Sequence, residues 1–365
     1  MTYEVVVVGG GVVGAATLYH LALAGCSGAV LLERETIGSG STSKAAGGFR
    51  AQFSDELNIR IALRSIDRLA RFGDEPGFDI DFKQWGYLFL VSQDDEDTFR
   101  SSVDLQRDLG VPTEWLTPDE AAEMVPGLDV TGITAATFGP LDGYATPEAV
   151  AQGYAVAARR LGATVRQGVE VVRISSDRGR VTGVELRDGS SVSADTVICC
   201  TGVWAPDLVT PLGLDLPVRP ERRDVFFTGT DPLVHRLPLT IDFATGFYFH
   251  REGTGLLLGG REHSLEDLAP HAMARLPMLE DLEVRHGWWG WYAMSPDHNA
   301  IVGRADEPDG LLYATGFSGH GFQQGPVVGE YLAALALDQP PPLDLAALSA
   351  DRFAAGDLRP EKNVV

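Results

Sequence analysis

The sequence predicts an α/β protein, α+β overall, in which a parallel sheet flanked by helices is joined to a second, mainly antiparallel sheet. Two observations predict this fold class. Apolar strands that end in glycine turns recur at 5–14, 196–205 and 310–316, and helical patterns follow the first and the last of them. Between 218 and 291 the pattern changes to short alternating strands, which is typical of an antiparallel sheet with one covered face.

The N-terminal segment has the order strand, glycine turn, helix, strand. Four consecutive valines, Val5 to Val8, predict a buried parallel strand. A helix is expected over 12–24 and a second strand over 29–32. This order is the beginning of a Rossmann-like domain.

Three glycines and one acid lie at the spacing of a dinucleotide site. Gly9, Gly11 and Gly14 would serve the tight turn, the close approach of backbone to a pyrophosphate, and the contact between helix and strand. The N-terminus of the helix would then face the phosphates. Glu33 ends the second strand, where a carboxylate can accept hydrogen bonds from a ribose. The spacing predicts an adenine dinucleotide but leaves NAD and FAD open.

Further elements follow the same alternation of helix and strand. The loop over 36–48 is rich in glycine, serine and alanine, so its backbone donors should lie along a ligand. The other expected elements are helices over 55–72, 94–109, from Thr117, over 147–161 and over 327–336, and strands over 87–91, 224–228, 247–250 and 256–259, with two or three more between 163 and 187.

Composition limits the class of partner. The chain has 365 residues, 29 basic against 51 acidic, and a net charge of -22, which disfavours binding to nucleic acid or to an anionic membrane surface. The apolar stretch 5–24 is broken by glycines and lacks a basic region before it, so we interpret it as core rather than as a membrane span or signal. Cys26, Cys199 and Cys200 read as buried thiols of a reducing compartment. A cytoplasmic protein without a metal site is expected.

Four segments resemble one flavoprotein family. They are the N-terminal glycine turn, the Thr201–Ala205 turn, the Ser295-Pro296-Asp297 segment with the apolar 300–303 after it, and the loop Gly316-Phe317-Ser318-Gly319-His320-Gly321-Phe322. Together they resemble the D-amino-acid-oxidase-type family, and within it the sarcosine oxidase and dehydrogenase branch. The resemblance covers nearly the whole chain and implies FAD as the cofactor. It also implies a discontinuous FAD-binding domain over 1–82, 140–217 and 292–365, with a substrate domain over 83–139 and 218–291.

The expected cofactor contacts come from the glycine turn, the 36–48 loop and the later turns. They are Gly9, Gly11, Val12, Val13, Gly14, Glu33, Arg34, Ser41, Thr42, Ser43, Lys44, Gly47, Val171, Gly202, Trp204, Gly316, Ser318, Gly319, His320, Gly321, Phe322 and Gln323. Relatives anchor the flavin covalently through a histidine in the first loop or a cysteine before the Pro-Asp segment. This chain has no histidine in 41–47 and Gly290 at the cysteine position, which predicts noncovalent FAD.

The resemblance implies removal of a hydride equivalent from a carbon next to nitrogen, giving an imine that hydrolyses. Our candidates for the catalytic residues are His320, Tyr292, Tyr248 and Arg50. Trp288, Trp289 and Trp291 lie nearby in the sequence and would favour an N-alkyl or cationic amine if they faced the cavity. Packing in the core is the alternative for these tryptophans, and for at least two of them it is the preferred one.

Some family residues are replaced. Phe53 and Gln323 stand where relatives hold the substrate carboxylate with an arginine and a lysine. Arg50 remains, and Arg251 or Arg261 are alternatives for the same task. The chain has no lysine between 83 and 362 to assist O2, so the electron acceptor is O2 or another acceptor.

The expected substrate is therefore a small-molecule amine, namely a secondary or N-methyl amino acid or a related amine. One alternative is an enzyme of the same fold that acts on a primary amino acid, such as glycine or a D-amino acid, or on a 2-hydroxy acid. A flavin-binding subunit of a larger complex, completed by a partner subunit, is another. A nicotinamide dehydrogenase is the last.

Overall fold

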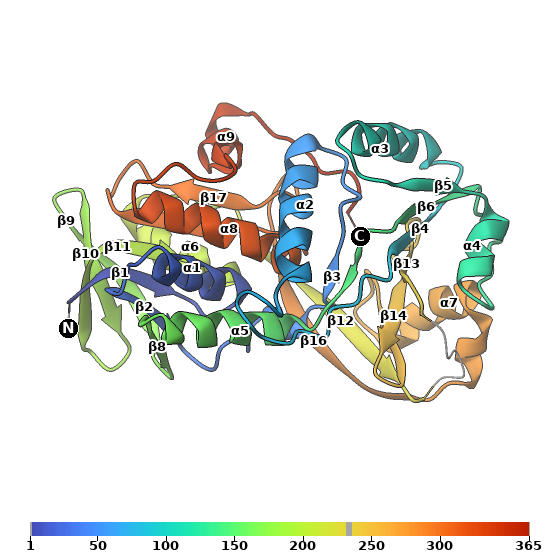
Figure 1. Ribbon diagram of the computed structural model, residues 1–365, viewed down its shortest axis with the longest axis horizontal. Coiled ribbons are helices and arrows are strands. Elements are labelled where there is room, and N and C mark those ends of the chain that lie inside the picture. The colour runs from blue at the N-terminus through green and yellow to red at the C-terminus, as the bar shows by residue number, and fades with distance from the viewer. Residues whose placement is uncertain (1, 231–235, 365) are drawn as a thin grey trace.

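The computed structural model describes residues 2–230 and 236–364, which form two eight-stranded sheets and one two-stranded sheet. Figure 1 shows the two large sheets side by side along the long axis of the molecule, with the N-terminus beside the first. This arrangement confirms the predicted fold class. Residues 1, 231–235 and 365 of the predicted domains lie outside the described residues.

The first sheet is mostly parallel and draws its strands from distant parts of the chain. Its strands are β1 (Thr2–Val8), β2 (Ala29–Glu33), β8 (Thr164–Gln167), β9 (Val171–Asp177), β10 (Arg180–Leu186), β11 (Ser191–Cys199), β17 (Ile301–Arg304) and β18 (Leu311–Thr315). The order is β17-β18-β11-β1-β2-β8, with β10 and β9 attached to β11. The antiparallel pairs of this sheet are β17 with β18, β10 with β11 and β9 with β10. The strands expected near 5, 29, 196 and 310 are therefore neighbours in one sheet.

Helices bury both faces of this sheet, which explains the unbroken run of valines. Val5 and Val7 belong to one core with α1 (Val12–Leu23), α5 (Pro147–Arg160) and α8 (Gly321–Ala336). The alternate residues Val6 and Val8 belong to a second core with α6 (Ala205–Val209). Because successive side chains point to opposite faces, a strand covered on both sides is apolar throughout.

The second sheet is antiparallel except for one pair. Its strands are β4 (Tyr87–Val91), β5 (Glu114–Leu116), β6 (Ala135–Gly139), β12 (Arg219–Thr228), β13 (Leu239–Asp242), β14 (Tyr248–Glu252), β15 (Gly255–Gly259) and β16 (Val284–Met294). Their order is β16-β12-β15-β14-β13-β4-β6-β5, and only β13 and β4 are parallel. One face packs on α4 (Pro118–Met124) and α7 (Leu265–Arg275), and α3 (Glu96–Asp108) lies on the other.

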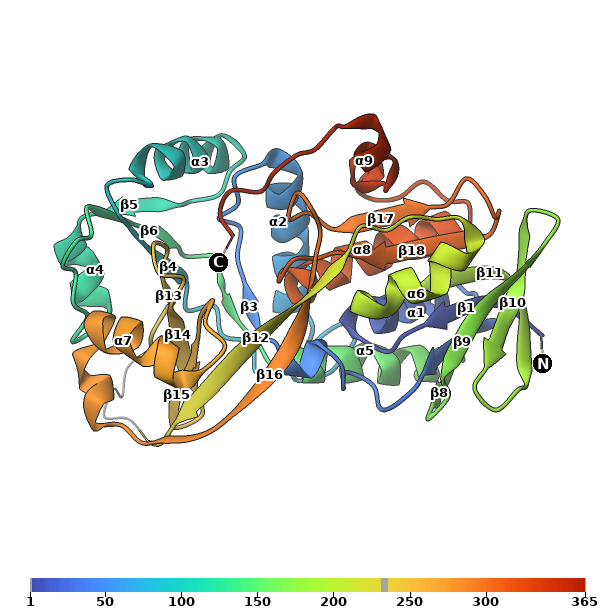
Figure 2. The same ribbon diagram turned by 180° about the vertical axis from the view of Figure 1, so that it is seen from behind.

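A long ribbon of β12 and β16 connects the two sheets (Figure 2). The pairing runs from Arg219 opposite Met294 to Thr228 opposite Val284. Met294 then bridges to Phe317, and the Ser318 N–H donates to the Ala293 carbonyl at 2.9 Å. We expected only an aromatic cluster at 288–291, because two glycines among three tryptophans hide the alternation of a strand. The ribbon brings the second sheet against the loop after β18.

Small residues explain the largest boundary difference. We expected the last long helix to begin at Val327, but α8 begins at Gly321 and contains Pro326. Gly325 packs on Val12 and Gly329 on Ala16, where added Cβ atoms would approach within 3.0 Å and 2.6 Å. Close packing on α1 therefore stabilises a helical turn that glycine and proline disfavour in isolation.

Several short elements complete the chain. Thr117 begins α4 as expected and forms a capping box with Glu120, whereas Thr146 precedes α5 without a side-chain bond to it. The remaining elements are β3 (Gly48–Phe49), which pairs with β7 (Gly143–Tyr144), the helices α2 (Glu56–Ala70) and α9 (Asp351–Ala355), and the 3-10 turns η1 (Thr42–Lys44), η2 (Gly202–Trp204), η3 (Thr210–Leu212), η4 (Pro277–Asp281) and η5 (Ala346–Leu348). Among the residues that the structure describes, no helix combines the length and apolar character needed to cross a membrane.

Candidate active site

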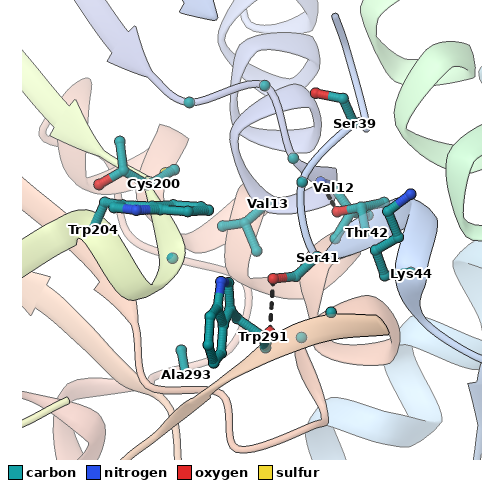
Figure 3. A pocket seen from close by; sticks show the side chains of 18 of the residues that line it. Val12, Val13, Ser39, Ser41, Thr42, Lys44, Cys200, Trp204, Trp291 and Ala293 are labelled. Atoms are coloured by element: carbon teal, nitrogen blue, oxygen red, sulfur yellow. Dashed lines mark hydrogen bonds between the residues drawn. The ribbon is translucent and has the colours of Figure 1, made fainter. Parts of the chain in front are cut away.

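A cavity of about 460 Å³ runs from the carboxyl ends of the first sheet to the β12–β16 ribbon (Figure 3). Its first-sheet end is lined by Gly9, Gly11, Val12, Glu33 and Thr42, among others. Its second-sheet end is lined by Arg223, Val225, Tyr248, Gly290 and Tyr292. The volume lies in the range of small-molecule and cofactor sites.

At the first-sheet end, the turn after β1 is possible only with glycine. Gly9 has φ +101°, and a Cβ there would lie 2.5 Å from the Cys200 carbonyl oxygen. A Cβ at Gly14 would lie 2.0 Å from the Gly9 carbonyl oxygen. The turn is therefore folded tightly between α1 and β11, and its backbone is open to the cavity.

The N-terminus of α1 faces the cavity with a cap from another segment. Gly11 precedes the helix and has no side chain to cap it. The Val12 N–H instead donates to Thr42 Oγ1 at 3.0 Å, and this bond is visible in Figure 3. The neighbouring Ser41 hydroxyl donates to the Trp291 carbonyl at 2.7 Å, so η1 joins α1 to β16. Helix N-termini of this kind favour anions such as phosphate.

Glu33 is held by backbone donors at the end of β2. Its Oε2 accepts from the Gly10 N–H at 2.6 Å, and its Oε1 accepts from the Glu35 N–H at 2.8 Å. Beyond it, the Arg34 guanidinium lies 4.0 Å from the centroid of the Trp204 ring, in cation–π contact. The carboxylate is thus oriented beside the glycine turn, and an aromatic wall lies opposite.

The second-sheet end is one face of four paired strands. Arg223 lies opposite Gly290 in the β12–β16 ribbon, and Val225 lies opposite Gly259, which pairs with Tyr248. Because residues two apart share a face, Arg223, Val225, Gly290 and Tyr292 all point into the cavity with Tyr248.

Glycines make room for the two tyrosine rings. A Cβ at Gly259 would lie 2.2 Å from Cζ of Tyr248, and one at Gly319 would lie 2.6 Å from Cε2 of Tyr292. Burial raises the pKa of Tyr248 well above its usual value, and burial also raises the pKa of Tyr292 against the opposing effect of Arg223. Both hydroxyls are therefore neutral at physiological pH and can donate hydrogen bonds.

Arg50 and His320 form a buried cluster outside the lining of the cavity. An Arg50 Nη2 atom lies 3.2 Å from His320 Nε2, and the guanidinium lies 4.1 Å from the Phe53 ring centroid. It also donates to the carbonyls of Gln52 and Asn363. Burial and the positive charge of Arg50 hold the pKa of His320 well below its usual value, so the ring is neutral.

A buried carboxyl supports the same cluster from the chain before β7. Asp142 accepts from the Ala51 N–H at 2.8 Å and from Gln52 Nε2 at 3.0 Å. Burial raises its pKa to about 7, against the effects of these bonds and of Arg50. Arg50, Gln52 and Asp142 thus form one network behind the second-sheet end.

A second buried pair holds the turn between β16 and β17. Asp297 and Arg352 are both almost fully buried and lie 2.8 Å apart, with a second bond at 2.9 Å. Arg352 lowers the pKa of Asp297 although burial alone would raise it. This bidentate pair fixes the turn at which the chain passes from the second sheet back to the first.

The structure brings most of the predicted site residues together. Those that line the cavity are Gly9, Gly11, Val12, Val13, Glu33, Arg34, Ser41, Thr42, Lys44, Val171, Gly202, Trp204, Tyr248, Tyr292, Gly319, Gly321 and Phe322. The others support it from behind or lie beside it: Gly14, Ser43, Gly47, Arg50, Gly316, Ser318, His320 and Gln323. Gln323, for example, accepts from the Arg50 N–H at 2.7 Å. The roles assigned to all these residues remain predictions.

Other lining residues were not predicted. Arg223 and Val225 come from the ribbon, and Cys200 and Phe317 lie next to predicted positions, whereas Trp291, one of the three tryptophans considered for the cavity, does line it. The alternation at 223–225 was a signal for one face of a strand, but nothing in it indicates what that face meets. Arg251 and Arg261, which we named as alternatives for binding a carboxylate, are absent from the described lining.

The residues at the first-sheet end fit an adenine dinucleotide. Added Cβ atoms at Gly9 and Gly14 would collide with backbone, an α1 N-terminus faces the cavity, and Glu33 lies beside it. These are the features that a pyrophosphate and a ribose require. The cavity then continues to the second sheet, so a longer cofactor fits better than a mononucleotide.

Comparison with known proteins agrees with this fit. The sequence profile of the DAO family, described as FAD dependent oxidoreductase, matches residues 4–335. The chain is 29% identical over 377 residues to 4-methylaminobutanoate oxidase (formaldehyde-forming) of Paenarthrobacter nicotinovorans, covering 96% of this chain and 45% of that protein. It is also 29% identical over 381 residues to mitochondrial sarcosine dehydrogenase of Homo sapiens, covering 96% of this chain and 41% of that protein. It therefore spans less than half the length of these two relatives.

A solved structure matches along nearly its whole length. L-proline dehydrogenase from P.horikoshii has a TM-score of 0.91 and 32% sequence identity, covering 98% of this chain and 99% of that chain. The similarity thus includes both sheets and the ribbon between them.

Proposed function

Because this chain belongs to the DAO family of FAD-dependent oxidoreductases, we propose that it oxidises the carbon next to nitrogen in a secondary or N-methyl amino acid or a related amine. One observation carries the proposal. The same cavity joins the first-sheet end, which fits a dinucleotide, to the second-sheet end, which presents two tyrosines and an arginine. The similar proteins support the proposal, since their names give methylaminobutanoate, sarcosine and proline as their substrates. The product is an imine, which water hydrolyses.

FAD supplies the two-electron acceptor when it is bound. Backbone at Gly9 to Gly11 and the α1 N-terminus would hold its pyrophosphate, and Glu33 its ribose. Gly290 and the segment 41–47 offer no cysteine or histidine for a covalent link, which supports noncovalent binding. The residues of this chain thus bind the cofactor mainly through backbone.

The second-sheet end would bind and orient the amine. Tyr248 and Tyr292 form apolar walls that exclude water, and their neutral hydroxyls can donate to an anionic or carbonyl oxygen. An apolar environment also favours the uncharged amine, which is the form that loses a hydride equivalent. We assign Arg50 and His320 a positioning role, because Arg50 contacts His320 and Gln323 and so holds the segment 320–323 from outside the cavity lining.

The electron acceptor and the cellular setting are also part of the proposal. O2 or another acceptor completes the cycle, and a partner subunit is a further component if the acceptor is a protein. Three unpaired, buried cysteines support a reducing, cytoplasmic setting.

An anaerobic reduction screen tests the proposed function. Purified holoenzyme is mixed without O2 with L-proline, sarcosine, glycine or lactate, and the visible absorbance of the oxidised flavin is followed. Bleaching by a secondary or N-methyl amine supports the proposal, and bleaching only by glycine or lactate supports the alternatives. Admission of air then separates rapid reoxidation by O2 from use of another acceptor. A yellow protein that no amine bleaches would contradict the proposal and favour a flavin-binding subunit.

A further inference from the structure

Arg223 is the one charged side chain that β12, β14 and β16 contribute to the described lining of the cavity. The acids of the lining, Glu33, Glu35, Glu170 and Asp207, all lie in or next to elements of the first-sheet end. In a chain with a net charge of -22, the second-sheet end therefore contributes one cation to the lining, which Glu221 compensates in part from outside the lining. Such an end favours an anionic ligand group.

Only some of the N–H donors of the Arg223 guanidinium have hydrogen-bond partners. Its Nη1 lies 2.6 Å from Glu221 Oε1 and donates to the Arg222 carbonyl at 3.2 Å. Its Nε is buried and has no hydrogen-bond partner. A buried donor without a partner is unfavourable by about 1–3 kcal/mol, so an acceptor that reached this edge of the guanidinium would relieve that cost. Nε belongs to the guanidinium edge that, together with Nη2, can hold a carboxylate with two parallel bonds.

The surroundings of Arg223 combine a packed strand with an aromatic ring. Gly290 lies opposite it in the ribbon and packs against Lys44, whose Cβ would lie 2.6 Å from an added Cβ, while the Tyr292 ring centroid is 5.3 Å from the guanidinium carbon. Tyr248 and Tyr292 line the same end. A planar carboxylate between the arginine and two neutral tyrosine hydroxyls would meet donors from several sides.

We propose that Arg223 binds the carboxylate of the substrate and makes the site selective for amino acids over amines without a carboxylate. Glu221 restrains this selectivity, because it competes for the same guanidinium. The proposal rests on the proposed function for the identity of the amine. It assigns the anchor to the ribbon, which is a different place from Phe53 and Gln323, the positions at which relatives carry cationic residues.

The test measures binding without turnover. Wild-type holoenzyme is titrated by calorimetry with pyrrole-2-carboxylate and with pyrrole-2-carboxamide, which has the same ring and no charge. We expect Arg223→Gln to weaken binding of the carboxylate by about 10- to 100-fold and binding of the carboxamide by less than about 3-fold. Bound FAD, read from its visible absorbance, should stay at the wild-type ratio.

Arg219→Gln is the matched control. Arg219 lies on the same strand, is 72% exposed at its side chain, and has an Nη2 atom 3.3 Å from Glu221. Its loss should change both affinities by less than about 3-fold, because it is outside the cavity lining. Equal weakening of both ligands by Arg223→Gln, or no weakening of either, would overturn the proposal. So would a change confined to the flavin redox potential.

Glu221→Gln tests the proposal if the Arg223→Gln protein fails to bind FAD. Removing the competing carboxylate leaves the guanidinium in place, so affinity for pyrrole-2-carboxylate should rise by about 2- to 10-fold while affinity for the carboxamide is unchanged. An unchanged or weaker affinity for the carboxylate would refute the assignment. If wild-type protein prefers the carboxylate but reduces no amine, the proposed function fails and the assignment of Arg223 stands.

Discussion

The two ends of the cavity are built from different kinds of groups. The first-sheet end presents backbone N–H groups at a glycine turn, a helix N-terminus and a carboxylate held by two backbone donors. The second-sheet end presents side chains, two neutral tyrosines and an arginine, on strands paired across the sheet. Backbone donors tolerate changes of side chain, whereas a sheet face can change its chemistry with each substitution. The first end therefore suits a ligand common to many enzymes, and the second suits discrimination among substrates.

Gly14→Val should have the largest effect on cofactor binding. The cause of this effect lies entirely in the first-sheet end. The new Cβ would lie 2.0 Å from the Gly9 carbonyl oxygen, so the turn must move. We expect no FAD to remain after gel filtration, and a loss of about 3 kcal/mol in the free energy of unfolding. Gly73→Ala is the control, because a Cβ there would meet no atom within 4 Å. Retention of FAD by Gly14→Val at the wild-type ratio would contradict the role given to this backbone.

Arg352→Met tests whether the two ends depend on one another. It leaves Asp297 buried without its partner, which should lower the free energy of unfolding by about 3–5 kcal/mol. Since the pair holds the turn between β16 and β17, affinity for FAD and affinity for pyrrole-2-carboxylate should both fall. Urea unfolding and the two titrations measure this.

The exposed pair Arg359–Asp357 offers the matched control, because its atoms are also within 3.0 Å but its side chains are more than half exposed. Arg359→Gln should lower the free energy of unfolding by less than about 1 kcal/mol. A similar loss in both variants would show that the Asp297–Arg352 pair does not couple the ends.

Asp142→Asn should have the smallest effect on ligand binding and should act mainly through the pH dependence of the free energy of unfolding. Burial raises the pKa of Asp142 to about 7, and an unfolded aspartate has a pKa of about 3.9. The folded state therefore binds more protons between these values, so the contribution of Asp142 is present below about pH 4 and is lost as the pH rises to about 7.

The measurement is the difference in free energy of unfolding between wild type and Asp142→Asn from pH 4 to pH 8. It should shift against the wild type as the pH rises to about 7 and then become constant. A difference that is constant over the whole range would mean that Asp142 is not protonated in the folded protein. Affinity for FAD should be unchanged, since the residue lies behind the second-sheet end.

The two ends of the cavity also differ in how far the sequence predicts them. Gly9, Gly11, Gly14 and Glu33 lie within one short segment, so their spacing alone predicts the first-sheet end. Arg223 enters the cavity only because β12 pairs with β16, a strand some sixty residues later in the chain, in one particular register. Short-range patterns carry no information on such a pairing. His320 shows the same limit, because its loop was identified but the direction of its side chain, toward Arg50, was not.

The pairing of β1 with β11 and of β11 with β18 also determines when this protein can fold during synthesis. The ribosome releases the chain from its N-terminus. One neighbour of β1, the strand β2, follows at once, but the other neighbour, β11, comes almost two hundred residues later, and β18 comes after a further hundred. β1 therefore lacks one neighbour until β11 has emerged, and β11 lacks one until residue 315 has emerged. Long-range pairings of this kind slow folding and prolong exposure to chaperones. Loading of the cofactor is consequently a late event in the life of the chain.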